Sequence, residues 1–283
     1  MKYAQMVCAA SQNVGDDIQS LAAAAQLPRV DLHLDRDRLN AVEGPGPIGL
    51  VMNAWFMDGN GWPPSDAVSP AFVGFHVADR SRDLVARHAP YLKRYEPIGV
   101  RDKSTAEFLT SLGIAAEVTY CMTLTLPPRA QAPAHGKVMI VDADDIAVPG
   151  TLERKSVRLT HVIPLMRDAT KLQYARELLE YYRDSASLVI TTRLHCALPC
   201  IAMGIPVVFF GSASNYPRTR PVSDVGATIY NRQRHKKGLT PGSLLGRALG
   251  RVDWSPKPLD VSPIKARLLD AVAARMEALA RNK

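Results

Sequence analysis

The amino-acid sequence predicts two α/β domains with parallel sheets that face each other across a cleft. Short apolar runs alternate with longer amphipathic runs, as strands alternate with helices in parallel α/β proteins. The length of 283 residues is near the upper size of one hydrophobic core, which favours two domains. A stretch from Pro127 to Gly136 has no periodicity, contains three prolines and is typical of an interdomain linker.

The first series of runs predicts an N-terminal domain over residues 1–130. A glycine at position 113 follows its last helix, where glycine commonly ends one. The expected strands are Ala4–Cys8, Val30–Leu34, Ile48–Met52, Phe72–Phe75 and Ile98–Val100, and the expected helices are Asp16–Gln26, Arg80–Ala89 and Lys103–Leu112.

The second series predicts a C-terminal domain over residues 136–260 and a final helix in residues 261–283. Ser262 can cap this helix and Pro263 suits its first turn. The stretch from Gly211 to Pro258 is rich in Ser, Arg, Gly and Pro and receives no assignment. The expected strands are Lys137–Val141, Val157–Thr160, Leu188–Thr191 and Pro206–Phe210, and the expected helices are Lys171–Tyr182 and Cys196–Met203.

The charge distribution favours a small anionic substrate over a nucleic acid. The formal net charge is +8, from 35 basic and 27 acidic residues. The densest basic pieces, 218–220 and 232–237, carry no interleaved aromatic residues on which bases could stack, and a solvated surface loop explains the second piece. Scattered arginines in an enzyme suit an anionic ligand.

The cysteines and the hydropathy pattern favour a cytoplasmic protein. The four cysteines lie far apart or at helical spacing, which matches neither a disulfide framework nor a zinc site. No run approaches the roughly 18 consecutive apolar residues of a membrane span, and we expect no signal peptide at the N-terminus. Membrane contact is therefore expected to be peripheral at most, and the oligomeric state stays open.

The strongest chemical signal is the segment in which Leu188–Thr191 runs into Thr192-Arg193-Leu194-His195 and then a helix. Such a turn directs backbone N–H groups and a positive helix end toward a ligand. Arg193 adds a forked donor for carboxylate or phosphate, and His195 can exchange a proton near neutral pH. The alternative is that both side chains merely cap and brace the turn.

Two other predicted strand ends carry polar residues. Asn13 and Asp16 flank Gly15, which permits close approach of the backbone, although capping of the helix by Asp16 explains this motif equally well. Arg101 would point into the cleft from the next such end. Its alternatives are a surface pair with Asp102, or Asp102 acting only as a helix cap.

A set of aromatic residues is typical of sugar binding. Asn53 and Trp55 stand close together, Trp62 follows, and tryptophan planes pack on the C–H faces of sugar rings. Core packing at a loop is the alternative. His76 ends a predicted strand and either faces the cleft or satisfies a turn, and His161 has the same two interpretations.

Several catalytic signatures are absent from the sequence. It contains no G-x-x-x-x-G-K-[ST] phosphate loop, no G-x-G-x-x-G after a strand, no H-E-x-x-H and no G-x-S-x-G. Kinase, dehydrogenase, zinc protease and esterase functions are therefore disfavoured.

Five short motifs occur in order along the chain. They are N-x-G-D at 13–16, Asn53-Ala54-Trp55-Phe56, Gly99-Val100-Arg101-Asp102 with Thr105, Cys121-Met122-Thr123-Leu124-Thr125, and Thr192-Arg193-Leu194-His195 with Cys196-Ala197-Leu198-Pro199-Cys200. This ordered set resembles the polysaccharide pyruvyl transferase family over roughly residues 1–210. Thr192 stands where the family usually has serine, Val100 where it often has another small residue, and the chain matches poorly after Gly211.

The resemblance implies two Rossmann-like domains in the arrangement of the metal-independent B-type glycosyltransferases. It also implies phosphoenolpyruvate as donor, a saccharide as acceptor, a pyruvate ketal as product, and neither metal nor cofactor. Arg193 and His195 match the donor site, Arg101 a second donor arginine, and Asp16 the aspartate of the N-terminal motif. We expect His195 or Asp16 to shuttle the proton, with His195 as our hypothesis. The expected substrate-binding residues are Arg193, Arg101, Leu194, Thr192, Asn13, Gly15, Asn53, Trp55 and His76.

Two other functions compete with pyruvyl transfer. A B-type glycosyltransferase that uses a nucleotide sugar would share the fold, so fold alone does not separate the two. A non-catalytic descendant is disfavoured because Asp16, Arg101, Arg193 and His195 are all intact. The acceptor sugar, including whether it is lipid-linked, stays open.

Overall fold

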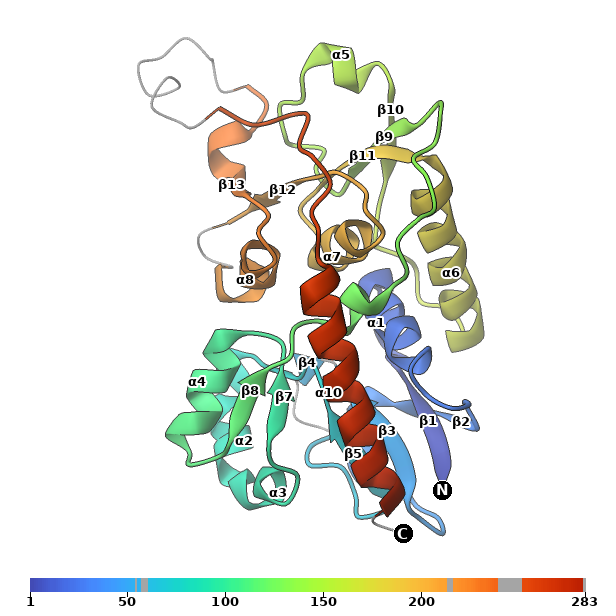
Figure 1. Ribbon diagram of the computed structural model, residues 1–283, viewed down its shortest axis with the longest axis vertical. Coiled ribbons are helices and arrows are strands. Elements are labelled where there is room, and N and C mark those ends of the chain that lie inside the picture. The colour runs from blue at the N-terminus through green and yellow to red at the C-terminus, as the bar shows by residue number, and fades with distance from the viewer. Residues whose placement is uncertain (54, 57–60, 213–215, 239–250, 282–283) are drawn as a thin grey trace. The chain divides into compact units, whose positions relative to one another are not determined.

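A computed structural model describes residues 1–53, 55–56, 61–212, 216–238 and 251–281 (Figure 1). The chain divides into two compact units. Unit 1 comprises residues 1–125, 164–176 and 262–283, and unit 2 comprises residues 126–163 and 177–261. Each unit contains a parallel sheet with helices, which confirms the predicted mixed α/β class with parallel sheets.

Unit 1 is built on a four-stranded parallel sheet in the order β2-β1-β3-β5. All five residues of β3 are buried, as expected of a central strand covered on both faces. Two shorter parallel pairs, β4 with β6 and β7 with β8, complete the strands described in this unit. The bounds are β1 Lys2–Val7, β2 Leu32–Asp35, β3 Ile48–Met52, β4 Trp55–Phe56, β5 Val68–Phe72, β6 His76–Val77, β7 Ile98–Val100 and β8 Ala116–Val118.

Helices of unit 1 pack against strands of the four-stranded sheet and of the β7–β8 pair. The last of them, α10, packs against β5 and buries Leu268, Val272 and Leu279, and Figure 1 shows it in red beside that strand. The helices are α1 Val14–Ala24, α2 Arg82–Arg87, α3 Ala89–Lys93, α4 Lys103–Ser111 and α10 Ser262–Arg281, with 3-10 turns at Arg36–Ala41, Asp79–Ser81 and Met122–Thr125.

Unit 2 is built on a five-stranded parallel sheet in the order β10-β9-β11-β12-β13. Helix α7 packs against β11, β12 and α8. Phe210 lies in the core with Tyr230 and Trp254. The elements are β9 Lys137–Val141, α5 Gly150–Glu153, β10 Ser156–Leu159, β11 Ala186–Thr191, α7 Leu194–Ala202, β12 Val207–Gly211, α8 Tyr216–Asp224, β13 Ile229–Asn231 and a 3-10 turn at Arg232–His235.

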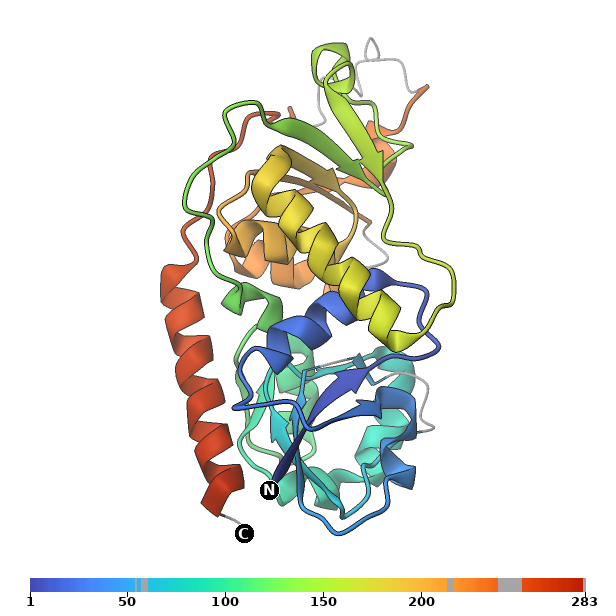
Figure 2. The same ribbon diagram turned by 90° about the vertical axis from the view of Figure 1, so that its right-hand side faces the viewer.

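Helix α6, Asp168–Ser185, belongs to both units, because residues up to 176 group with unit 1 and residues from 177 with unit 2. It is the long yellow helix of Figure 2. No helix in the described part of the chain combines the length and the apolar character needed to cross a membrane.

Most predicted elements are present, and the differences have local causes. Strand β5 ends at Phe72 instead of starting there. Pro70 lies within the observed strand, which is an edge strand of the sheet, where proline is tolerated. The helix expected over Arg80–Ala89 is interrupted at His88, whose ψ of 22° separates α2 from α3. The unassigned stretch after Gly211 contains α8 and β13.

Candidate functional site

In unit 1, a buried polar cluster lies where β7 ends and α4 begins. We call Arg101, Asp102, His76 and Thr105 the Arg101 cluster. Asp102 caps α4, accepting a hydrogen bond from the backbone N–H of Thr105 at 2.9 Å. Its other oxygen, Oδ2, lies 2.5 Å from Nδ1 of His76. Asp102 is therefore both a helix cap and a partner of His76, which the sequence did not predict.

Asp102 is held in its ionised form. Burial by itself would raise the pKa of this carboxyl. The hydrogen bond and charge of His76 outweigh that effect, together with the charge of Arg101 and the Thr105 N–H, and lower the pKa of Asp102 to about 2. The carboxylate is thus charged throughout the physiological range, and its oxygens are engaged by His76 and Thr105.

Arg101 is the cationic member of this cluster and is only 2% exposed, so it does not form the surface pair considered from the sequence. Its Nε lies 3.7 Å from Oδ2 of Asp102, which is an ion-pair distance and too long for a hydrogen bond. Within the described residues, Nε and Nη2 of Arg101 have no hydrogen-bond partner. Buried N–H groups of this kind are costly to leave unpaired, so the arrangement is suited to binding an anion.

The N-x-G-D motif forms the start of α1, at the carboxyl end of β1. Asn13 is the N-cap and accepts a hydrogen bond from the Gly15 N–H at 3.3 Å. The alternative in which Asp16 caps the helix is therefore wrong. Asp16 is half-buried and accepts hydrogen bonds from Ser11 Oγ at 2.6 Å and from Gln19 Nε2 at 3.4 Å.

The residues of the aromatic motif differ in their surroundings. Asn53 is buried, and its amide donates to the backbone oxygen of Gln19 at 3.0 Å, which ties the end of β3 to α1. Trp62 is buried and stacks on Phe75 at 5.6 Å, so core packing explains that tryptophan. The backbone of Trp55 pairs with that of His76 between β4 and β6, whereas its side chain lies outside the described residues, as does Ala54.

In unit 2, the R-L-H segment forms a turn fastened to the neighbouring strand. We call Thr192, Arg193, His195 and Asp142 the Arg193 cluster. Thr191 accepts a hydrogen bond from the Arg193 N–H at 3.0 Å through its Oγ1, which also donates to the backbone oxygen of Val141 at 3.0 Å. Thr192 donates from Oγ1 to the backbone oxygen of Asp142 at 2.7 Å. The hydroxyl at position 192 thus anchors the turn.

Asp142 is a functional candidate that the sequence reasoning missed. Its Oδ2 accepts hydrogen bonds from Arg193 Nε at 2.8 Å and from the His161 N–H at 2.9 Å, and its Oδ1 from Thr160 Oγ1 at 2.6 Å. Burial works to raise the pKa of Asp142, but these bonds and the Arg193 charge hold it below its usual range. The sequence offered a signal for Asp142, because this carboxylate directly follows a predicted strand. Arg101 was selected from its position after a strand in the same way.

Helix α7 begins at Leu194, which is buried, and is distorted at the next residue. His195 is half-buried and has φ −87° and ψ 18°, outside the helical range. Pro199 lies inside the helix. A proline lacks the N–H that would bond the carbonyl four residues earlier, and its ring clashes with that carbonyl. The departure of His195 from helical geometry follows from Pro199.

A buried network lies beside α7. His161 is fully buried, and its Nε2 is 2.9 Å from the hydroxyl of Tyr182. Cys196 and Cys200 are also fully buried. Against the effect of burial, hydrogen bonds from Cys200 and His161 lower the pKa of the Cys196 thiol, whereas burial and the neighbouring Cys196 raise that of Cys200. His161 is thus an interior residue, not one exposed at the site.

Lys171 supports the N-terminal motif of unit 1. It is fully buried on α6 and donates from Nζ to the backbone oxygen of Cys8 at 2.5 Å. Its Nζ also lies 3.2 Å from Asp168 and 4.0 Å from Asp17. This lysine fastens the loop between β1 and α1, which carries Asn13.

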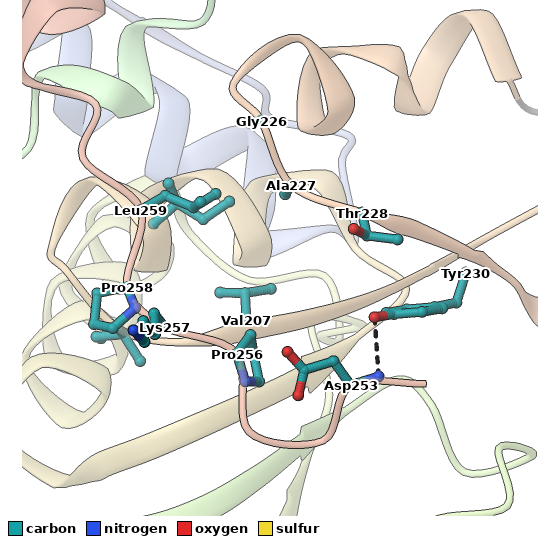
Figure 3. Close-up of a pocket in the computed structure, with 12 residues that line it drawn as sticks. Val207, Gly226, Ala227, Thr228, Tyr230, Asp253, Pro256, Lys257, Pro258 and Leu259 are labelled. Atoms are coloured by element: carbon teal, nitrogen blue, oxygen red, sulfur yellow. Dashed lines mark hydrogen bonds between the residues drawn. The ribbon is translucent and has the colours of Figure 1, made fainter. Parts of the chain in front are cut away.

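A cavity of about 220 Å³ in unit 2 lies away from the predicted residues (Figure 3). Val207, which begins β12, and Thr228, which precedes β13, line it together with Lys257 and Leu259. It therefore opens at the amino ends of these strands, whereas Arg193 follows a carboxyl end. We assign a candidate site in each unit to the strand end that carries its polar cluster, because ligands of parallel sheets bind there.

Comparisons with known proteins identify a family for this chain. The model of the family described as polysaccharide pyruvyl transferase matches residues 73–214, half of the chain. This stretch contains His76, the rest of the Arg101 cluster and the whole Arg193 cluster. No curated protein matches the sequence significantly. A solved structure of a functionally uncharacterised Klebsiella pneumoniae protein has 12% identity and a TM-score of 0.48, covering 81% of this chain and 93% of that one.

Proposed function

The chain belongs to the polysaccharide pyruvyl transferase family, and on this premise we propose that it transfers a pyruvyl group from phosphoenolpyruvate to a saccharide acceptor. The product is a pyruvate ketal on two sugar hydroxyls, and inorganic phosphate leaves. The Rossmann-like, B-type arrangement implied by the sequence resemblance is part of this proposal.

The observation that carries the proposal is the buried cation Arg101. It is 2% exposed and has two nitrogens without hydrogen-bond partners in the described part of the chain, and the nearby Asp102 is engaged by His76 and Thr105. An anion that brings its own oxygen acceptors would satisfy those N–H groups. Phosphoenolpyruvate offers both a phosphate and a carboxylate.

The proposed reaction balances without a further reactant. A proton adds to the C3 methylene of phosphoenolpyruvate, which becomes a methyl group and leaves positive charge at C2. One sugar hydroxyl bonds to C2 and loses its proton. The C2–O bond to phosphate then breaks, and the second hydroxyl closes the ketal and loses its proton. Of the two hydroxyl protons, one balances the proton added to C3 and the other leaves with the phosphate.

The side chains receive roles that match this charge flow. Arg193 and Arg101 bind the anionic groups of the donor, with Thr192 and Leu194 shaping the turn around Arg193. His195 shuttles the proton, because an imidazole gives and takes protons near neutral pH and its backbone is set apart from the regular helix. Asp16 is the alternative proton carrier, and Asn13, Gly15, Asn53, Trp55 and His76 are proposed for the substrate side.

Replacement of His195 tests the proposed chemistry. We expect His195→Ala to abolish phosphate release from phosphoenolpyruvate in the presence of an acceptor, without loss of the folded state. The measurement combines phosphate release over a panel of saccharides and glycolipids with mass spectrometry of the products. Asp16→Asn, tested in parallel, identifies the proton carrier if it abolishes turnover and His195→Ala does not.

Donor binding separates this proposal from a nucleotide-sugar transferase. Phosphoenolpyruvate should raise the melting temperature of the protein, because a ligand that binds only the folded state stabilises it. Nucleotide sugars should leave the melting temperature unchanged. A shift with nucleotide sugars alone would favour the glycosyltransferase alternative.

A further inference from the structure

Asp142 combines a left-handed backbone conformation with a carboxylate that accepts three hydrogen bonds. Its φ of +49° lies in the left-handed region. Among the described residues other than glycine, Tyr120 also has a positive φ. This conformation is unfavourable for most L-residues, although aspartate and asparagine tolerate it and glycine adopts it freely. A residue other than glycine at such a position has a backbone cost, and such positions cluster at functional sites, which raises the question of what the carboxylate of Asp142 does.

The hydrogen bonds to the carboxylate of Asp142 come from two segments of the chain. Thr160 Oγ1 and the His161 N–H fix the carboxylate to the segment that follows β10, at 2.6 Å and 2.9 Å. Arg193 Nε, at 2.8 Å, is the third donor and comes from the turn before α7. The carboxylate is therefore fixed by Thr160 and His161 and in turn binds Arg193. Its backbone oxygen also accepts the Thr192 hydroxyl, so two consecutive residues of the turn depend on it.

The contact with Asp142 uses only one corner of the guanidinium. An arginine carries five N–H donors in a rigid planar fork, one on Nε and four on the two Nη atoms. Nε of Arg193 donates to Asp142. Within the described chain, the hydrogen bonds and ion pairs of this guanidinium are those with the Asp142 carboxylate. The side chain of Arg193 is 32% exposed, so the protein does not enclose it.

We propose that Asp142 is a positioning residue, which fixes the plane of Arg193 so that its paired Nη groups face a phosphate or carboxylate of the substrate. The proposal rests on the proposed function, in which Arg193 binds phosphoenolpyruvate. Bidentate recognition requires a defined guanidinium plane, and a carboxylate on Nε supplies it.

The substitution Asp142→Asn tests the proposal with little disturbance of the backbone. Asparagine tolerates the left-handed conformation and keeps one oxygen as an acceptor, but loses the charge that engages Arg193. We expect KM for phosphoenolpyruvate to rise about tenfold, the size of one lost charge-assisted hydrogen bond, with a smaller change in kcat. Asp144→Asn is the matched control, because that side chain is 70% exposed and pairs with Arg158, and its KM should equal that of the wild type.

A double-mutant cycle separates positioning from general stability. If Asp142 acts through Arg193, Asp142→Asn should have little further effect on donor binding in an Arg193→Lys background. An equal rise of KM in both backgrounds would overturn the proposal, as would wild-type KM in the Asp142→Asn protein.

The guanidinium can also be observed without any substrate. In ¹⁵N-labelled protein, the Nε–Hε signal of Arg193, identified by its loss in Arg193→Lys, should be protected from solvent exchange. This protection should disappear in Asp142→Asn. An unchanged signal would overturn the positioning role even if phosphoenolpyruvate proves not to be the donor. Conversely, a wild-type protein that neither binds nor converts phosphoenolpyruvate would refute the proposed function and leave this test intact.

Discussion

Arg193 of unit 2 and Arg101 of unit 1 are held in different ways. Arg193 is half-buried and hydrogen-bonded to Asp142, whereas Arg101 is buried and makes no hydrogen bond to the nearby Asp102 through Nε. Asp102 contributes to the fold through His76 and the cap of α4, so its importance for stability is separable from the importance of Arg101 for binding.

This separation gives a prediction for the Arg101 cluster. We expect Arg101→Met to remove the rise in melting temperature caused by phosphoenolpyruvate, with little loss of stability in its absence. Asp102→Asn should lower the free energy of unfolding by about 3 kcal/mol, because it leaves buried partners unpaired. Urea unfolding and thermal shift measurements on both variants check this. A larger loss of stability in Arg101→Met than in Asp102→Asn would contradict it.

Asp17 gives a pH-dependent prediction. Burial raises the pKa of this carboxyl from 3.8 to about 6, with the charge of Lys171 opposing the shift. Between about pH 4 and pH 6, the folded state therefore keeps a proton on Asp17 that the unfolded chain has released. As the pH rises through this range, Asp17 lowers the free energy of unfolding. We expect Asp17→Asn to stabilise the protein by on the order of 2 kcal/mol at pH 8 and by much less at pH 4.

Urea midpoints of both proteins at the two pH values measure this difference. The control is Asp66→Asn, because the side chain of Asp66 is 93% exposed, and it should show no pH-dependent gain. A gain of equal size at pH 4 and pH 8 would rule out the titration of Asp17 as its cause.

The sequence pointed to candidate residues that follow predicted strands, but not to their partners. Arg101 and Arg193 were proposed because ligands of parallel sheets bind at the carboxyl ends of strands, and each residue follows such an end. The contact of Asp102 with His76 joins residues 26 positions apart, and that of Asp142 with Arg193 residues 51 apart. Such pairs depend on strand order and register, which local periodicity does not encode.

At the scale of single elements, α7 shows how a helix can be less regular than its composition suggests. Its interior proline distorts the turn that contains His195. Interior proline is unfavourable for helix stability. The helix therefore carries a cost in the part that presents the candidate proton carrier.

Replacement of Pro199 should restore a regular helix, which should raise stability and lower activity. We expect Pro199→Ala to raise the free energy of unfolding by about 1 to 3 kcal/mol and to lower kcat by about tenfold, because His195 moves toward helical φ and ψ. Denaturation curves and steady-state kinetics measure the two effects. A variant that gains both stability and activity would show that the distortion has no catalytic use.

Element prediction succeeded where the pattern was local and regular. Lys137–Val141 is confirmed as β9, and the expected final helix is present, with Ser262 as its first residue instead of its cap. The short strand β8 was missed, because Ala116–Val118 offers three residues with a central glutamate. Helix α8 was missed because Pro221 lies inside it and its composition resembles a loop. In these two elements, tertiary contacts override weak local signals.

At the scale of the whole molecule, each unit has a hydrophobic core of its own. In unit 1 the core contains Leu50 and Phe72, and in unit 2 it contains Ile190 and Phe210. Residues 262–283 group with unit 1, although they follow unit 2 in the sequence. The stability of unit 1 therefore depends on the last helix of the described chain.

Removal of residues 262–283 tests this dependence. Loss of the packing of Leu268, Val272 and Leu279 should lower the free energy of unfolding of unit 1 by about 5 kcal/mol. In a Trp254→Phe background the remaining tryptophans, Trp55 and Trp62, belong to unit 1 and report its unfolding by fluorescence. The complementary protein, which retains only Trp254, should show an unchanged transition for unit 2.

The way the chain divides also sets the order in which the units can be completed during synthesis. Domains generally fold in the order in which the ribosome produces them. Here the segments of unit 2 have all been made once residue 261 is reached, whereas unit 1 still lacks α10. The unit whose first strand is translated first is thus the last to be finished, and β5 must wait for its covering helix until after unit 2 has been made.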